Sequence, residues 1–409
     1  INNILPLYDQ FYKKKIELPD YDFFSPDAFN DAKKLAELYF KEGFDEVEAK
    51  AGVHYGTYKV YVNYIPIADI TQMDSILYDK IKKNAINVKG INYADPNYLR
   101  MAGYLELSRP HGDISRWEKV FTRISLLNKH YPINEKKCDV STFIRNFEDN
   151  IPNISNIYKI IKNDIIEQGL VFFGGFALYS YGKYLSDDKR KKLNKYPDFD
   201  VLSINPEESA NKIKNTLEKN GLTNITINKK KGFGEIISEH YEVKIGDETV
   251  VFIYKTLACH SYNVITVNNK KIKIATIETM LSFYLAFLYA DRDYYDIHRI
   301  ICIAEYLFYI QSKNKIQNKG VLKRFTINCY GKQETLEDIR GNKAEKYKEL
   351  KNNKNSREYQ KYFLRYYPLE KHTTFRKLKN KKTNRTKKSN NSKKTKKSNN
   401  SKKTKKTIN

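Results

Sequence analysis

The segment LPDYDFFSPD, residues 18–27, sets the architecture to be expected of this chain, and YPDFDVLSINPEE, residues 196–208, repeats its pattern. Each segment places two aspartates two positions apart in a short apolar and aromatic run: Asp20 and Asp22, then Asp198 and Asp200. Such a run predicts a β-strand. Because alternate strand residues face the same side, each pair puts two carboxylates on one face, about 7 Å apart. The recurrence predicts a duplicated unit.

Both repeats continue from the Asp-bearing strand into a helix. In the N-terminal repeat, Ser25-Pro26-Asp27 predicts the helix start and Gly43 its end; in the C-terminal repeat, Asn205-Pro206-Glu207 and Gly221 take these places. Further strands are expected near residues 44–53, 58–68, 222–228, 235–245 and 249–259, and further helices near 93–127, 277–290 and 294–309. A strand, a helix and then hairpin strands predict an α+β fold with small mixed sheets backed by helices.

The chain is therefore expected to have four parts. These are an N-terminal domain at residues 1–137, a connector at 138–169, a related domain at 170–370 and a disordered Lys-rich tail at 371–409. The chain does not begin with Met, so we expect it to be an internal or processed part of a longer protein.

The positive charge is concentrated at the C-terminus. The net charge is +26, but residues 371–409 hold 17 of the 74 Lys and Arg and no acid, so the rest carries 57 basic against 48 acidic residues, or +9. The tail contains TKKSNNSKK twice, at residues 386–394 and 395–403, and has too few apolar residues to form a core. A basic arm favours a polyanion, RNA or DNA, over a membrane; the alternative is a solubility or targeting tail.

The four cysteines are Cys138, Cys259, Cys302 and Cys329. They are widely spaced, without a CxxC motif or a Cys/His cluster. This argues against a structural zinc site or a disulfide framework and predicts a reducing compartment. No segment reaches 18 consecutive apolar residues, so no membrane association is expected, and residues 274–290 are expected to form a core helix.

A third carboxylate, Asp69, follows the apolar run YKVYVNYIPIA. We expect its strand to lie beside the strand of Asp20 and Asp22, so that the three aspartates form a divalent-metal site. A solvated aspartate at a strand end is the alternative.

The C-terminal repeat is expected to have lost this chemistry. Matching strand ends puts Cys259 opposite Asp69, and a thiol is a poor Mg²⁺ ligand, so Asp198 and Asp200 are expected to be structural. Gly174-Gly175 forms a strand-to-helix turn that lets backbone N–H groups approach a phosphate. The corresponding glycines of the N-terminal repeat would fall a few residues before residue 1.

Residues 109–130, RPHGDISRWEKVFTRISLLNKH, predict an amphipathic helix. Arg116, Lys119 and Arg123 share one face, opposite an apolar stripe that includes Trp117 and Phe121. The basic face is either simply solvated or a contact for RNA or phosphate.

Together LPDYDFFSPD, RPHGDISRWEKVFTRISLLN, GGFALYSYG and PDFDVLS resemble the catalytic subunits of viral poly(A) polymerases, from poxviruses and other large DNA viruses. The resemblance covers about residues 1–370. It implies tandem nucleotidyltransferase-like domains, the first catalytic and the second degenerate. It also implies template-independent addition of AMP from ATP to mRNA 3′ ends with Mg²⁺ or Mn²⁺, with Asp20, Asp22 and Asp69 as catalytic and metal-binding residues.

The resemblance further implies a single-stranded RNA 3′ end as partner and the host cytoplasm or the virion as location. Since the poxvirus enzyme works with a separate processivity partner, such a partner and a homodimer are the two arrangements to test. Two other functions remain open: a nucleotidyltransferase of other base specificity, and a non-catalytic RNA-binding scaffold.

Overall fold

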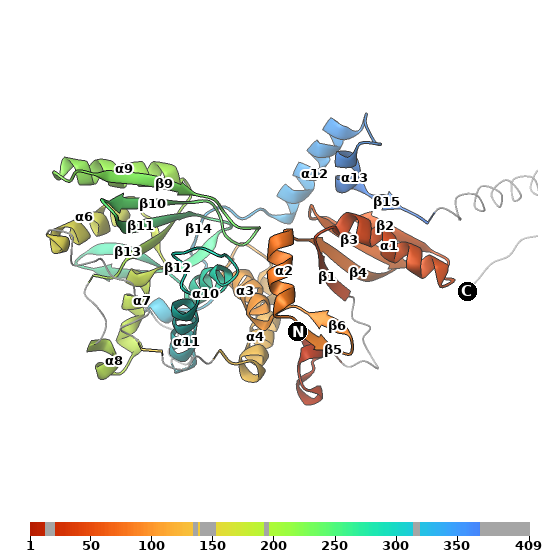
Figure 1. The fold of residues 1–409 in the computed structure, drawn as a ribbon, viewed down its shortest axis with the longest axis horizontal. Coiled ribbons are helices and arrows are strands. Elements are labelled where there is room, and N and C mark those ends of the chain that lie inside the picture. Colours follow the sequence, from red (N-terminus) through yellow and green to blue (C-terminus); the bar gives the residue numbers. More distant parts are fainter. Residues whose placement is uncertain (13–20, 134–137, 140–152, 192–195, 314–319, 369–409) are drawn as a thin grey trace, which may run out of the picture. The chain divides into compact units, whose positions relative to one another are not determined.

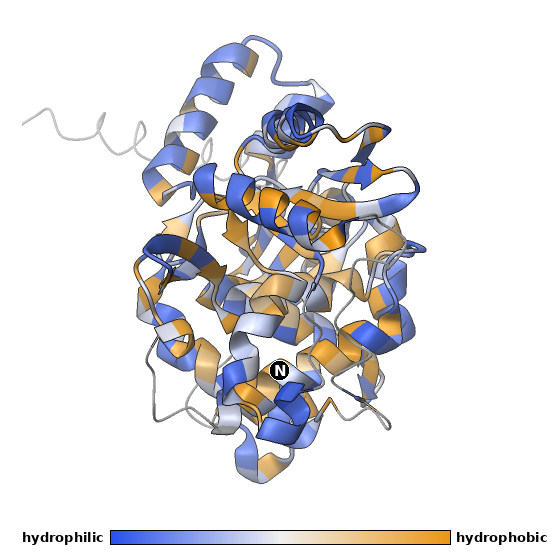
Figure 2. Ribbon diagram, turned by 90° about the vertical axis from the view of Figure 1, so that its left-hand side faces the viewer, coloured by the Kyte–Doolittle hydropathy of each residue, from blue (hydrophilic) through white to orange (hydrophobic). Residues whose placement is uncertain are grey.

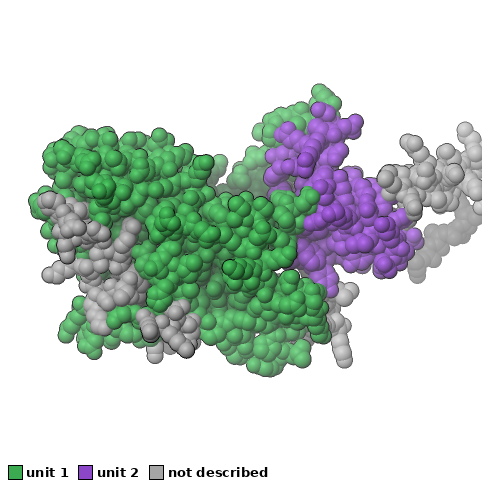
Figure 3. Space-filling model, viewed as in Figure 1, with its two compact units in different colours: residues 1–19, 24–27, 71–352 green, residues 20–23, 28–70, 353–409 purple. Residues whose placement is uncertain are grey.

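The computed structural model describes residues 1–12, 21–133, 138–139, 153–191, 196–313 and 320–368 (Figure 1). The chain forms two compact units: unit 1 holds residues 1–19, 24–27 and 71–352, and unit 2 holds residues 20–23, 28–70 and 353–409 (Figure 3). Asp20 and the Lys-rich tail lie outside the described residues, so the predictions made for them stay predictions.

Unit 2 is built on a five-stranded sheet, counted over the described residues, in the order β1-β4-β3-β2-β15. Its strands are β1 (Tyr21–Ser25), β2 (Val47–Ala51), β3 (Thr57–Val62), β4 (Ile65–Gln72) and β15 (Arg365–Tyr366). Helix α1 (Ala28–Lys41) packs against β2 and β3. Its buried side chains Ala28, Phe29 and Ala32 join the core formed by alternate residues of the strands. One face of the sheet is therefore covered, as the alternation in β3 predicts.

The predicted helix boundaries are confirmed here, but one strand prediction is wrong. The Ser25 hydroxyl accepts a hydrogen bond from the Asp27 N–H (2.9 Å) at the start of α1, and Gly43 follows the helix with φ +92°. The strand expected at residues 58–68 is two strands, because Asn63 and Tyr64 both have positive φ and make a tight hairpin turn. Asp69 consequently lies inside β4 rather than at the end of a longer strand.

Unit 1 contains an eight-stranded mixed sheet, again counted over the described residues, in the order β14-β12-β13-β7-β8-β11-β10-β9. The strands are β7 (Val171–Phe172), β8 (Phe199–Ser203), β9 (Ile225–Lys230), β10 (His240–Ile245), β11 (Glu248–Lys255), β12 (His260–Val267), β13 (Lys270–Ala275) and β14 (Cys329–Tyr330). Strands β8 and β11 are parallel, whereas β7 and β8 are antiparallel. A separate hairpin pairs β5 (Ile86–Val88) with β6 (Ile91–Tyr93).

Helices α6, α7, α9 and α10 pack on strands of this sheet. Apart from α1, the described helices are α2 (Ser75–Lys83), α3 (Pro96–Leu107), α4 (Trp117–His130), α6 (Ile154–Glu167), α7 (Gly175–Tyr181), α8 (Asp187–Lys191), α9 (Pro206–Lys219), α10 (Ile277–Phe287), α11 (Ile297–Lys313) and α12 (Leu336–Leu350) in unit 1 and α13 (Arg357–Phe363) in unit 2. Short 3₁₀ turns are η1 (Asn2–Ile4), η2 (Leu7–Asp9), η3 (Ile114–Arg116), η4 (Gly182–Tyr184) and η5 (Gly320–Leu322). Hydrophobic residues gather along the strands and on one side of several helices (Figure 2).

Helix α10 is the expected core helix. Every one of its residues is buried, and it packs along α3 and α11 (Figure 1). No described helix combines the length and the apolar character that crossing a lipid bilayer requires.

The predicted duplication is visible in the topology. The elements β1, α1, β2, β3 and β4 recur as β8, α9, β9, β10 and β11, and the sheet orders β1-β4-β3-β2 and β8-β11-β10-β9 are the same. The helix of the second set begins at Pro206 and is followed by Gly221 with φ +82°, as the sequence predicts.

The compact units differ from the predicted domain boundaries. Helix α6 lies in the segment expected to be a connector, yet Ile157, Ile161 and Ile165 are buried in the unit 1 core. Near the C-terminus, Leu364 joins the core of unit 2 and β15 pairs with β2. The apolar residues of each segment decide which core it joins. The division into a catalytic and a degenerate domain remains a prediction.

Candidate functional site

The candidate site lies on two neighbouring strands, β1 and β4. Asp22 is the second residue of β1 and is exposed, and Asp69 is the fifth residue of β4. Ala68 and Ile70, on either side of Asp69, point into the core, so the Asp69 side chain projects from the opposite face of the sheet. The adjacency of the two strands confirms that part of the sequence prediction.

Lys59 of β3 is the partner of Asp69. Its Nζ lies 2.5 Å from Asp69 Oδ2, and the two side chains are 32% and 21% exposed. The buried residues of β3 are Tyr58, Val60 and Val62, so the alternation places Lys59 on the same open face as Asp69. Sequence reasoning did not single out Lys59, although this alternation was a signal for it.

The other oxygen of Asp69 is left without a partner. Oδ1 is buried and has no hydrogen bond among the described residues. A buried carboxylate oxygen with no donor costs free energy, and a bound cation or a proton would offset that cost. Carboxylate oxygens are the ligands that Mg²⁺ and Mn²⁺ prefer. Asp69 therefore offers an oxygen suited to a divalent cation, and Asp22 offers a second carboxylate on the neighbouring strand.

In the repeat of unit 1, an aromatic residue occupies the position equivalent to Asp69. The hairpin turn at residues 63–64 corresponds to the turn at 246–247, so Asp69 corresponds to Phe252 of β11. In the parallel pair β8–β11, Phe252 lies directly beside Asp200. The expectation that Cys259 stands opposite Asp69 is wrong: β11 ends at Lys255, so Cys259 lies in the loop after it, whereas β4 continues past Asp69 to Gln72.

A narrow pocket marks this counterpart. Gly175, Asp198, Asp200, Phe252 and Arg299 line it together with aromatic side chains. The cavity volume is about 20 Å³, which is room for one or two water molecules. The aromatic lining and Phe252 are consistent with a site that has lost its chemistry.

The two glycines of GGFALYSYG are close against this acidic pair. A Cβ on Gly174 would lie 2.5 Å from Asp200 Cβ, and one on Gly175 would overlap Asp198 Oδ1. The backbone N–H groups of Phe173 and Gly174 both donate to the Asp200 carbonyl, at 2.9 and 3.2 Å. In unit 1, therefore, glycine is needed for close packing of the turn on β8.

Two of the three basic residues expected on one helix face are engaged in contacts within the protein. Arg116 belongs to η3 rather than α4, and its Nε lies 3.2 Å from Glu106 Oε1. Arg123 donates to the Tyr12 hydroxyl (2.8 Å), and its guanidinium lies 4.7 Å from the centre of the Phe11 ring. Lys119 is exposed. The apolar stripe is in the core as predicted, with Val120, Ile124 and Leu127 buried, whereas the RNA contact remains a prediction.

The cysteines form two disulfides, Cys138–Cys302 and Cys259–Cys329, with Cα–Cα distances of 5.4 and 5.1 Å. The prediction of unpaired cysteines is therefore wrong, because partners 164 and 70 residues apart in sequence become neighbours only through the fold. The expectation of a reducing compartment rested on unpaired cysteines and is therefore no longer supported. The fold also brings His111 beside the second disulfide, which the spacing of the cysteines in the sequence does not indicate.

His260 is completely buried and has no hydrogen-bond partner for either ring nitrogen among the described residues. Its ring packs 5.1 Å from the ring of Phe283. Burial, and secondarily the charge of Arg109, lowers the pKa of His260 to about 3. The imidazole is therefore neutral in the folded protein, and none of the described residues forms a hydrogen bond with it that would make it a base.

His260 is expected to make the stability of unit 1 depend on pH. The unfolded chain binds a proton near pH 6.5 and the folded chain only near pH 3, so the free energy of unfolding falls as the pH drops through this range. Between pH 8 and pH 5 this costs about 2 kcal/mol. His260→Phe should remove that loss, as measured by urea unfolding at both pH values. His54→Phe, which changes an exposed ring, is the control; equal pH dependence of His260→Phe and the parent would contradict the assignment.

Known proteins resemble this chain over part of its length. A family model described as the poly(A) polymerase catalytic subunit matches residues 1–113. A protein of Acanthamoeba polyphaga mimivirus is 25% identical over 202 residues, which is 49% of this chain and 33% of the relative. A protein of African swine fever virus is 32% identical over 123 residues, 29% of this chain and 26% of the relative. Both carry the name "Putative poly(A) polymerase catalytic subunit". The chain thus spans a third or less of these relatives.

The fold also has a solved counterpart. The crystal structure of the Megavirus polyadenylate synthase superposes with a TM-score of 0.68 at 21% sequence identity, covering 84% of this chain and 71% of that one. At this identity the likeness establishes the α+β fold with its helix-backed mixed sheets.

Proposed function

Because this chain belongs to the family of viral poly(A) polymerase catalytic subunits, we propose that it transfers AMP from ATP to the 3′ end of mRNA without a template. The proposed catalytic and metal-binding residues are Asp20, Asp22 and Asp69. The buried Oδ1 of Asp69, which has no hydrogen bond within the described part of the chain and lies on the strand next to that of Asp22, carries the proposal. The repeat supports it: in the register of β8 and β11, the residue equivalent to Asp22 lies beside the residue equivalent to Asp69.

The aspartates would hold Mg²⁺ or Mn²⁺, which supplies positive charge for the reacting phosphates when bound. Lys59 holds Oδ2 of Asp69 and so restricts the rotation of the carboxylate, while Oδ1 has no hydrogen-bond partner among the described residues and would serve as the metal ligand. Asp69 helps to remove the proton of the primer 3′-hydroxyl. The hydroxyl oxygen then forms a bond to the α-phosphorus of ATP, and the bond from that phosphorus to pyrophosphate breaks.

The other partners follow from the same proposal. The single-stranded RNA 3′ end is the acceptor, and the basic residues Arg116, Lys119 and Arg123 are candidates for contact with it. A processivity partner or a second copy of the chain would act outside the site described. The proposed location is the host cytoplasm or the virion.

The test is extension of a 5′-labelled single-stranded RNA by the full chain, with each NTP separately and with Mg²⁺ or Mn²⁺. We expect a ladder with ATP and none with the other nucleotides. A ladder with UTP or CTP instead would identify a nucleotidyltransferase of other base specificity. No extension with any nucleotide, together with salt-sensitive RNA binding, would favour the non-catalytic scaffold.

A further inference from the structure

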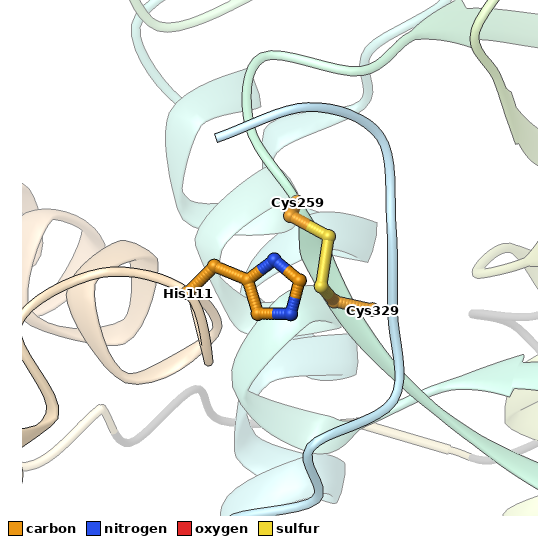
Figure 4. A group of neighbouring side chains, drawn as sticks. All are labelled: His111, Cys259 and Cys329. Atoms are coloured by element: carbon orange, nitrogen blue, oxygen red, sulfur yellow. A yellow bond between two sulfur atoms is a disulfide. The ribbon is translucent and has the colours of Figure 1, made fainter. Parts of the chain in front are cut away.

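Three side chains with nitrogen or sulfur donors meet in unit 1, and none of them belongs to the proposed catalytic site. They are His111, Cys259 and Cys329, and their donor atoms all lie within 4.8 Å of one another (Figure 4). His111 is exposed, Cys259 is buried and Cys329 is half-buried. Among the described residues, no other group of three such donors comes this close together.

The three chain segments that carry these donors meet at the start of β12. Cys259 directly precedes the strand, and Cys329 of β14 pairs with Ser261 in an antiparallel ladder. The N–H of Ser261 also donates to the carbonyl of Ser108 (2.8 Å), which anchors the loop that carries His111. The three donors are therefore brought together by buried backbone hydrogen bonds and not by the Cys259–Cys329 bond alone.

The imidazole is available as a ligand. No hydrogen bond of the His111 ring is found among the described residues, and the ring lies beside the two sulfur atoms (Figure 4). Two thiolates and a neutral imidazole form a ligand set typical of zinc, and the charge of the thiolates cancels that of the ion. The exposure of His111 leaves room for water as a fourth ligand.

We propose that the reduced form of this group binds Zn²⁺ and that the disulfide form does not. Two molecules of a thiol reductant exchange with the Cys259–Cys329 bond, giving two protein thiols and one molecule of oxidised reductant, which supplies both electrons. Zn²⁺ then replaces the two thiol protons, which pass to solvent. The oxidised form links two segments of unit 1, whereas the zinc form links three.

The two disulfides can be separated by mutation. The chain has four cysteines, so Cys138→Ser with Cys302→Ser leaves only Cys259 and Cys329. In this background, reduced under anaerobic conditions and freed of reductant, we expect one equivalent of Co²⁺ to bind with the absorption of a thiolate-ligated tetrahedral ion, and Zn²⁺ to displace it. The oxidised protein should show no such signal.

Two variants in the same background test the ligands. His111→Ala is expected to weaken Zn²⁺ at least about tenfold, since loss of even an outer-sphere partner costs 10- to 100-fold, and Cys259→Ser should abolish tight binding. His298→Ala is the matched control, because His298 Nε2 lies 3.8 Å from the sulfur of Cys302 in the other pair. Circular dichroism must show that each reduced variant is folded.

Two results would overturn the proposal: folded, reduced protein that takes up no Co²⁺ or Zn²⁺, or equal affinity in His111→Ala and its parent. Neither result bears on AMP transfer, which is tested separately by RNA extension.

Discussion

Replacing Asp69 by asparagine is expected to lower AMP incorporation by about 1,000-fold or more while the protein stays folded. Asparagine keeps the size of the side chain and an oxygen for Lys59 Nζ, but it loses the negative charge and the basicity of Oδ1. Asp22→Asn should have a similar effect, as should Asp20→Asn. The measurement is single-turnover extension of labelled RNA with ATP at saturating Mg²⁺ and Mn²⁺.

The controls use the same chemical change elsewhere. Asp200→Asn alters the residue equivalent to Asp22 in the C-terminal repeat and should leave AMP incorporation unchanged, because Phe252 stands where the third carboxylate would be needed. Asp31→Asn removes an exposed carboxylate in α1 that pairs with Lys34. Wild-type-like extension by Asp69→Asn would rule out the proposed site, and loss of extension in Asp200→Asn would contradict the degenerate reading of the second repeat.

Gly174→Ala is expected to destabilise unit 1 by about 3 kcal/mol. The new Cβ would lie 2.5 Å from Asp200 Cβ and 2.6 Å from its Cγ. A Cβ is fixed to its backbone, so relief requires the turn or strand β8 to move, and both are buried in the core. Urea unfolding followed by circular dichroism gives the change in the free energy of unfolding.

Gly341→Ala is the matched control for this prediction. Gly341 lies inside α12, and a Cβ there would meet no atom within 4 Å. Alanine should therefore stabilise that helix by about 0.5–1 kcal/mol through its higher helix propensity. Unchanged stability of Gly174→Ala would mean that the turn is not packed on β8 as described.

Local signals of the sequence predicted the elements well. Pro206 and Gly221 mark the start and end of α9, and Ser25 and Gly43 mark those of α1. These signals are readable because a capping residue or a left-handed glycine affects only the few residues next to it. The hairpin at Asn63-Tyr64 was missed, since tyrosine is not a residue that usually marks a left-handed turn. The strand ends were also misplaced: β4 continues to Gln72 and β11 stops at Lys255, so matching the expected ends led to Cys259 in place of Phe252.

The proposed site was partly predictable for a similar reason. Asp22 and Asp69 follow from strand patterns, and the adjacency of their strands confirms the expected neighbourhood. The contact between Lys59 and Asp69 Oδ2, and the isolation of Oδ1, depend on which strands pair and which face is buried. Strand pairing and the choice of the buried face cannot be determined from local patterns in one sequence.

By itself, then, the sequence determined the duplicated order of strand, helix and hairpin and the aspartates that point to metal chemistry, because these are properties of short segments. Only the tertiary structure decided which oxygen of Asp69 lacks a hydrogen bond within the described residues, which residue occupies the position equivalent to Asp69 in the second repeat and which cysteines meet a histidine. Those depend on contacts between residues far apart in the chain, such as Cys259 and Cys329, 70 positions apart. Such contacts are set by the packing of the whole core, to which each local segment contributes only a part.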